Sequence, residues 1–282
     1  MVALAAFLAF LQPALPQEKS AAAAKRPVRV AVINGMIMAG LWQEVTERFT
    51  KETGWPVEIV ATGERNGLDA AFREGGIDLI SMHSGDVTTN LVADGFTTDM
   101  KPWARNEMVI MGPEDDPAGI KGSHDGVAAL KQIVERGAKF VDFRDIGSRE
   151  IFHSLLEKSG LDPDPKWLVQ DFAEHKRAIL TYARQQHAYG IAGSLPVRFG
   201  KMNSEGMAVA VQGDPAMRKP YIVMVANPGK FPDANHEGAR ALSAFLLGAE
   251  TQKFLLSYGA TKEGGAPFFF PVNEAGWSKE KK

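Results

Sequence analysis

The chain of 282 residues contains no cysteine. This absence excludes disulfide bonds, thiolate catalysis and cysteine-ligated zinc, and it suits a protein that works outside the cytoplasm. A surplus of one charge is also missing, because the formal net charge is −2 at pH 7. The chain therefore has no global basic field that would recruit nucleic acid or anionic lipid, and we expect no nucleic-acid partner.

Long apolar runs are scarce as well. The run "VALAAFLAFL" (residues 2–11) has the length of a signal-peptide core and is too short to span a bilayer comfortably. The following tract "QEKSAAAAKRP" contains one cleavage pattern, Ala22-x-Ala24. We predict a signal peptide over residues 1–24 and a periplasmic or otherwise secreted protein, although a positively charged start is missing. The alternative is a frayed apolar tail.

Motifs for catalysis and nucleotide binding are absent from the sequence. Gly35 and Gly40 have the spacing of P-loop glycines, but Leu41-Trp42 stands where that loop needs Lys-Ser/Thr. The six histidines are dispersed, and neither a His-Glu-x-x-His zinc motif nor a Gly-x-Ser-x-Gly nucleophile motif occurs. We expect no catalytic residues, no enzymatic activity and no cofactor.

What the sequence does contain, from Val28 onward, is an alternation of strand and helix patterns. Strand patterns occupy residues 28–33, 57–62, 77–82 and a segment from Asn106 that Pro113 interrupts. Helical patterns lie between them at residues 39–53, 66–76 and 86–95, the last with Asp86 as its expected N-cap. This βαβα order predicts a mainly parallel sheet flanked by helices.

A second unit of similar size follows. Helical patterns cover residues 126–137, 148–160 with Ser148 as the cap, 175–186 and 236–259; strand patterns cover residues 139–143, 188–193, 207–212 and 221–228. The expected division is residues 28–110 for the first part of lobe 1, 111–214 for lobe 2, 221–275 for the return to lobe 1 and 276–282 for a tail. The strand ending at Pro113 and the strand at residues 221–228 would cross between the lobes.

Three segments carry a resemblance to a known family. They are "MVIMGPEDDPAGIKG", "VQGDPAMRKPYIVMVANP" and the ending "GAPFFFPV". In order and spacing they resemble the tungstate-binding, TupA-like branch of the ABC-transporter periplasmic solute-binding proteins, over about Val28 to Val272. The resemblance implies a periplasmic binding protein type II-like α/β fold, with two lobes of mainly parallel sheet joined by a hinge. It also implies a monomer that holds ligand between its lobes and docks on an ABC permease of the inner membrane.

The sequence departs from this family where the family holds its oxyanion. The family's first loop is rich in Thr and Ser, whereas residues 32–35 here read Val-Ile-Asn-Gly. The family's glycine-rich turn in the second lobe becomes "FRDIGSRE", which adds the charge of Arg149, and a later Gly-Met-Gly helix entry becomes His175-Lys176-Arg177. The resemblance therefore implies the fold, and tungstate specificity does not follow from it.

Ligand-contact candidates in lobe 1 come from loops after the strands, because the ends of parallel strands face the cleft in this architecture. They are Asn34, Gly35 and Met36 after the first strand, Arg65 and Asn66 before the second helix, and His83 after the third strand. The alternatives are a simple strand-to-helix turn and a surface loop. The methionines with His83 also resemble a soft-metal site, but methionine more often fills irregular gaps, so we expect no metal.

Candidates in lobe 2 are Ser148, Arg149, Lys176 and Arg177. Ser148 as a helix cap would leave backbone amides pointing outward, and Arg149 would add a fork that suits a carboxylate or oxyanion. Lys176 and Arg177 at a helix start would oppose the helix dipole, a cost that an anionic ligand would offset. The alternative for each is a solvated basic side chain.

These observations predict an exported, bilobal solute-binding protein that delivers a small anion to an ABC importer. One alternative keeps the fold but binds a small organic acid, with Arg149 taking the carboxylate. A second alternative is a ligand sensor for a membrane receptor. Tungstate itself is expected to bind weakly, because residues 32–35 offer too few hydroxyl donors.

Overall fold

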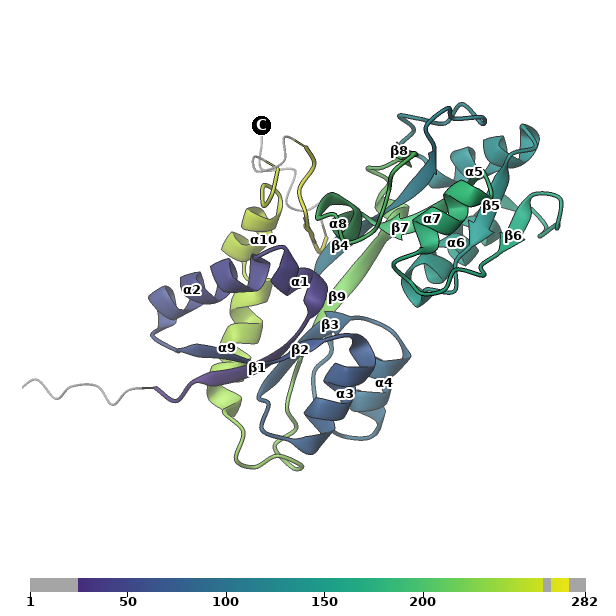
Figure 1. Ribbon diagram of the computed structural model, residues 1–282. Coiled ribbons are helices and arrows are strands. Elements are labelled where there is room, and N and C mark those ends of the chain that lie inside the picture. The colour runs from purple at the N-terminus through teal and green to yellow at the C-terminus, as the bar shows by residue number, and fades with distance from the viewer. Residues whose placement is uncertain (1–24, 261–264, 274–282) are drawn as a thin grey trace, which may run out of the picture.

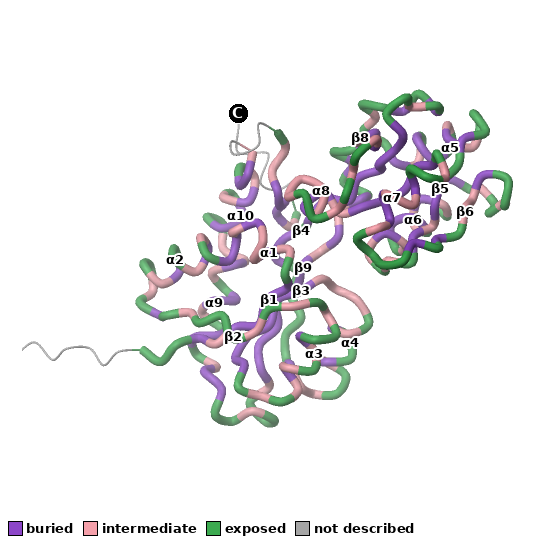
Figure 2. Tube along the Cα trace, viewed as in Figure 1, coloured by how far each residue is buried: buried purple, intermediate pink, exposed green. Residues whose placement is uncertain are grey.

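The computed structural model describes residues 25–260 and 265–273, which form two lobes joined by long crossing strands (Figure 1). The predicted signal peptide at residues 1–24 and the predicted tail at residues 276–282 lie outside the described residues. Buried residues follow the sheets and the crossing strands, whereas exposed residues lie mainly on outer helix faces and loops (Figure 2).

Lobe 1 is built on three parallel strands, with β1 (Val28–Ile33) between β2 (Val57–Gly63) and β3 (Leu79–His83). β1 is almost entirely buried because helices cover both faces of this sheet. The helices are α1 (Asn34–Met38), α2 (Leu41–Thr53), α3 (Arg65–Glu74), α4 (Asp86–Ala93), α9 (His236–Leu247) and α10 (Ala249–Leu255). Helices α2, α9 and α10 lie on one side and α3 and α4 on the other (Figure 1).

Lobe 2 repeats this arrangement with β5 (Lys139–Asp142) parallel to both β6 (Leu168–Gln170) and β7 (Ala188–Gly193). Helices α5 (Gly126–Glu135) and α6 (Ile146–Ser159) pack together in one apolar cluster, and α7 (Ile179–Gln185) belongs to a second cluster. Short α8 (Ser194–Arg198) follows β7, and β8 (Met207–Val211) pairs with the crossing strand. The parallel sheet expected from the sequence is therefore present within each lobe.

Two long strands connect the lobes. The first half of β4 (Lys101–Pro113) pairs with β9 (Arg218–Val225), and its second half pairs with β7 and β8. β9 in turn pairs with β3, which gives the strand order β2-β1-β3-β9-β4-β7-β5-β6, and β10 (Phe270–Pro271) also pairs with β4. All pairings of β4 and β9 are antiparallel, so the sheet direction changes where the chain crosses between lobes.

Two expected helix caps are wrong, the first by one residue and the second by three. The N-cap of α4 is Gly85, and Asp86 is the first helical residue. The N-cap of α6 is Asp145, whose carboxylate accepts the amide of Ser148, so Ser148 lies inside the first turn. Aspartate is as good an N-cap as serine, and here it starts the helix almost a turn earlier.

Two helix ends also differ from the expectation. Residues 175–178 form turns, and α7 begins only at Ile179, so His175, Lys176 and Arg177 do not begin a helix. The C-terminal helical pattern is split at Gly248, whose extended backbone (φ −67°, ψ 152°) separates α9 from α10. Glycine has the lowest helix propensity after proline, which explains the break in an otherwise continuous pattern.

A buried carboxylate ties the elements of lobe 1 together. Asp78 is fully buried and accepts the backbone amide of Arg29 at 2.7 Å, its guanidinium at 2.8 Å and the backbone amide of Asn235 at 2.9 Å. Asn235 is in turn the N-cap of α9. One side chain before β3 therefore fixes both β1 and the start of a C-terminal helix.

We expect Asp78→Ala to lower the free energy of unfolding by about 3–5 kcal/mol, because it leaves buried donors and a guanidinium without their partner. Asp69→Ala is the matched control, since Asp69 pairs with Arg73 in a partly exposed i,i+4 bridge. Such bridges contribute roughly 0.3–0.5 kcal/mol. Urea unfolding of both variants measures the difference, and equal midpoints would contradict the role of Asp78.

Candidate functional site

Segments from both lobes converge on β9. The ring of His83, the last residue of β3, stacks on Tyr221 with centroids 4.0 Å apart. Gly35 at the start of α1 lies against the same tyrosine, because a Cβ there would be 3.3 Å from the hydroxyl oxygen. From lobe 2, Gly147 in the first turn of α6 lies close to Lys219, whose Nζ is 3.8 Å from the Cβ position. We call this region the interlobe junction.

The first loop of lobe 1 supplies only part of what the sequence predicted. Asn34 is exposed and Gly35 is partly exposed, so both are open to a ligand. Met36 is fully buried, and its sulfur accepts the indole N–H of Trp42 at 3.0 Å. Met36 is therefore not a ligand contact in this structure. Met36 is the third residue of α1, and its side chain points into the core, where the flexible thioether fills the space beside Trp42.

Arg65 lies beside the loop that follows β3. Its guanidinium donates to the backbone carbonyl of Ser84 at 3.2 Å. The loop passes so close that a Cβ on Gly85 would be 2.6 Å from Nη1 of Arg65, and the φ of Gly85 is 153°. This positive φ favours glycine, and the missing side chain leaves room for the guanidinium. Asn66 is exposed, and within residues 25–260 and 265–273 its side chain has no hydrogen bond.

His83 is a neutral group in this junction. Burial, together with the nearby charges of Lys219 and Arg65, lowers the pKa of His83 to about 3. Its Nδ1 is buried and has no hydrogen-bond partner among the described residues. At neutral pH the imidazole therefore adds no positive charge, but it offers an unpaired ring nitrogen next to Tyr221.

The first turn of α6 is already occupied by carboxylates of the protein itself. The buried hydroxyl of Ser148 donates to Asp145 at 3.4 Å, and its amide donates to the same oxygen at 3.3 Å. The Nε of Arg149 is 3.2 Å from a carboxylate oxygen of Asp142. The predicted anion site at this helix start is therefore partly neutralised, although Arg149 itself is exposed enough to make further contacts.

Lys176 of lobe 2 forms an ion pair with lobe 1. Its Nζ is 2.8 Å from a carboxylate oxygen of Glu64, the N-cap residue of α3 in lobe 1. Both side chains are about half exposed or more. The neighbouring Arg177 is exposed, and its backbone amide donates to the ring of His175 at 3.2 Å.

Four residues that sequence reasoning missed form the floor of the junction. Lys219 on β9 is 5% exposed and is paired with Glu150 of α6. Asn106 on β4 is 4% exposed and lies directly opposite Lys219 in the β4–β9 ladder. Tyr221 is two residues further along the same face of β9. The sequence contained one sign of these residues, which is the lysine inside the strand pattern "RKPYIVMV".

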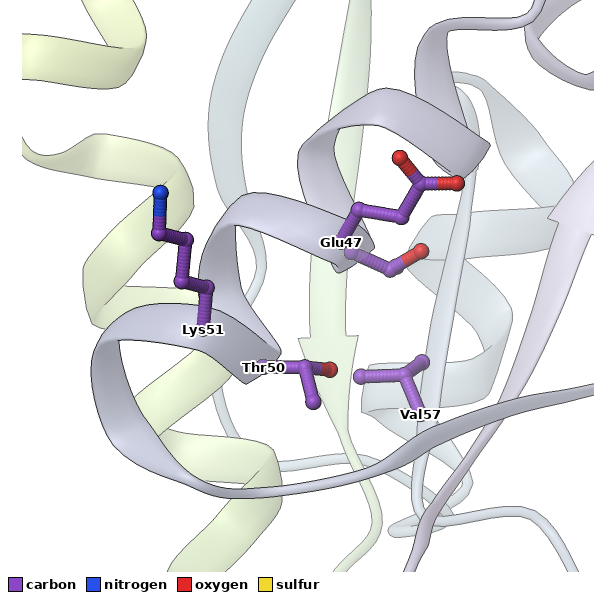
Figure 3. Close-up of a pocket in the computed structure, with 5 residues that line it drawn as sticks. Glu47, Thr50, Lys51 and Val57 are labelled. Carbon is purple, nitrogen blue, oxygen red and sulfur yellow. The ribbon is translucent and has the colours of Figure 1, made fainter.

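A separate hollow lies on lobe 1, away from the junction. It is lined by Thr46, Glu47, Thr50 and Lys51 of α2 and by Val57 of β2 (Figure 3). Thr50 and Val57 face one another, whereas the charged end of Lys51 points away (Figure 3). The hollow has few converging polar groups, so we do not assign it a ligand.

Two negative findings apply to the part of the chain that the structure describes. In that part no three His, Asp or Glu side chains gather closely enough to hold a metal ion. Its helices are also too short or too polar to cross a membrane.

Comparison with known proteins places the chain in a family of solute-binding proteins. Residues 28–261 match the family model described as bacterial extracellular solute-binding protein. The chain is 29% identical to the tungstate-binding protein TupA of Peptoclostridium acidaminophilum over 251 residues, which cover 88% of this chain and 86% of that protein.

Two solved structures share the fold. The tungstate-binding protein TupA from Desulfovibrio alaskensis G20 is 23% identical, with a TM-score of 0.70 over 87% of this chain and 98% of that one. The structure of the tungstate ABC transporter from Geobacter sulfurreducens is 25% identical, with a TM-score of 0.64 over 82% of this chain and 98% of that one. The bilobal fold expected from the sequence is confirmed.

The neutral His83 predicts how stability changes with pH. Because its pKa is about 3 in the folded protein and about 6.5 in an unfolded chain, only the unfolded chain gains a proton as pH falls below 6.5. Folding stability should therefore fall by up to about 2 kcal/mol between pH 6.5 and pH 5 from this residue. His83→Gln should remove that part of the pH dependence. Urea unfolding at pH 7.5, 6.5, 5.5 and 5.0 tests this, and parallel curves for the two proteins would contradict it.

Because Glu64 and Lys176 form an ion pair between the lobes, we expect the distance between the lobes to depend on the charges of these two residues. Since the chain has no native cysteine, spin labels can be attached at Glu52→Cys in lobe 1 and Lys158→Cys in lobe 2. Glu64→Lys should lengthen or broaden the distance distribution, because it places two cations opposite each other. The double reversal Glu64→Lys/Lys176→Glu should restore the parent distribution. If the single reversal leaves the distances unchanged, this pair does not hold the lobes together.

Proposed function

Because the chain belongs to the bacterial extracellular solute-binding proteins, we propose that it captures a small anion between its lobes and delivers it to an ABC permease of the inner membrane. The observation that supports anion capture most directly is Lys219, a buried cation where both lobes meet. Arg65 lies beside the same junction, and Arg149 lies in the first turn of the facing helix α6. The function is binding without catalysis, carried out by a secreted monomer.

The relatives support an oxyanion or another small anion as cargo. The TupA relative is named for tungstate binding, and this chain spans most of its length. The geometry favours weak tungstate binding, because the first loop lacks hydroxyl donors and Asp145 already fills the start of α6. Each missing charge-assisted hydrogen bond costs about 1.5–3 kcal/mol, so two would lower affinity by roughly two to four powers of ten.

A small organic acid is the second candidate, and two exposed apolar side chains favour it. Phe172, which follows β6, is 71% exposed, and Ile146 at the start of α6 is 58% exposed. The strands β5 and β6 are parallel neighbours, so both side chains lie at the same end of the lobe 2 sheet, where ligands bind in α/β folds. An inorganic oxyanion has no apolar part that could pack against these side chains.

Closure of the lobes around ligand tests this function. In this mechanism β4 and β9 act as the hinge and the lobes move as rigid bodies. Saturating anion should lower the radius of gyration measured by solution X-ray scattering. The panel consists of sulfate, molybdate, tungstate, acetate, lactate and succinate.

Lys219→Met should lose the response to the binding anion, because it removes the buried cation. Lys158→Ala, which changes an exposed lysine near the far end of α6, should keep it. Scattering curves that stay unchanged with every anion in the panel would count against the proposed function.

A further inference from the structure

We infer that the interlobe junction selects a small organic acid that carries a hydrogen-bond donor beside its carboxylate, such as a 2-hydroxy acid, and that Lys219 and Glu150 set this preference. The inference rests on the proposed function, because it names the class of anion for the same site. It goes beyond a general anion site because the junction contains a carboxylate of the protein, Glu150, beside the buried Lys219.

Lys219 is the group that recognises the carboxylate. Its ammonium has three donors, and among the described residues one of them is used, by Glu150. The lysine is 5% exposed, so water cannot readily satisfy the remaining donors. A ligand carboxylate supplies two acceptor oxygens for them. The hydroxyl of Tyr221 lies on the same face of β9 and has no hydrogen bond within the described residues, so it is a second donor.

Glu150 is the group that recognises a donor on the ligand. Its side chain is 45% exposed, whereas that of Lys219 is 6% exposed. The carboxylate of Glu150 can only accept hydrogen bonds, and it has acceptor capacity beyond the one bond to Lys219. A hydroxyl or amine next to the ligand carboxylate would meet this oxygen while the ligand carboxylate meets Lys219.

Asn106 adds a second unused acceptor at the same place. Residues directly opposite each other in an antiparallel pair share a face, so Asn106 lies beside Lys219. Its Oδ1 is buried and has no hydrogen-bond partner in the described parts of the chain. A buried acceptor without a partner is costly, and a ligand hydroxyl would remove that cost. The unpaired Nδ1 of His83 across Tyr221 is a further polar atom without a protein partner.

The same groups disfavour a bare oxydianion. A tetrahedral dianion carries only acceptors, so it leaves Glu150 and the Asn106 oxygen without a donor. It would also place two negative charges beside the carboxylate of Glu150, which repels them. His83 is neutral and does not compensate this charge. A site built to bond a ligand hydroxyl rejects analogues that lack it, often by 10⁴-fold or more in a fully buried site.

Matched pairs of ligands test the inference by titration calorimetry on the full chain. The pairs are acetate and glycolate, propionate and lactate, and succinate and malate, each differing by one hydroxyl, with tungstate and sulfate measured alongside. The parent protein should bind the hydroxy acid at least about tenfold more tightly in the pair that fits the junction. Tungstate should bind less tightly than that hydroxy acid.

Glu150→Gln should reduce the preference within that pair to about threefold or less and should strengthen tungstate binding. Glu157→Gln is the matched control, because Glu157 lies on the same helix and is exposed. It should behave like the parent. The partly exposed Glu150 tolerates an isosteric amide, and a melting curve for each variant checks that it is folded.

The outcomes separate this inference from the proposed function. If tungstate or sulfate binds the parent more tightly than every organic acid, or if both members of every binding pair bind equally, the inference fails and anion capture stands. If Glu150→Gln leaves the hydroxyl preference unchanged, Glu150 is not the selecting group and the inference fails. If no anion of either class binds, the proposed function fails and the inference fails with it.

Discussion

The antiparallel ladder between β4 and β9 is the constraint on which the molecule depends. Residues 101–107 of β4 pair with residues 218–223 of β9, and β4 then continues as a strand of lobe 2. A ladder of backbone hydrogen bonds holds its register strongly. The pairing therefore fixes which side chains lie between the lobes, and in the proposed mechanism the same two strands act as the hinge.

The ladder also explains why the charges at the junction lie where they do. Asn106 and Lys219 are neighbours only because β4 and β9 pair in this register. Lys219 cannot remain buried without a counter-charge, and Glu150 reaches it from the first turns of α6. The starts of the helices, which commonly hold anions, are less available here because Asp145 caps α6. The proposed recognition is thus centred on the crossing strands.

Part of the site could be predicted from the sequence, and part could not. Asn34, Gly35, Arg65 and His83 follow or precede strands in a βα pattern, and the structure places Gly35 and His83 against Tyr221 and Arg65 beside them. Met36 shares that loop, but its neighbour in space is Trp42, which the loop sequence does not reveal. Likewise, Arg149 pairs with Asp142 and Lys176 pairs with Glu64, and both ion pairs depend on the tertiary fold.

The sequence by itself determined the alternating strands and helices and the family resemblance, because these depend on periodicity and on short-range sequence patterns. Only the tertiary structure decided which polar groups meet. Lys219, Glu150 and Asn106 come from three elements that are distant in the chain, and each alone resembles an ordinary surface residue. Their burial and pairing arise from the crossing of β4 and β9, and no local pattern records that geometry.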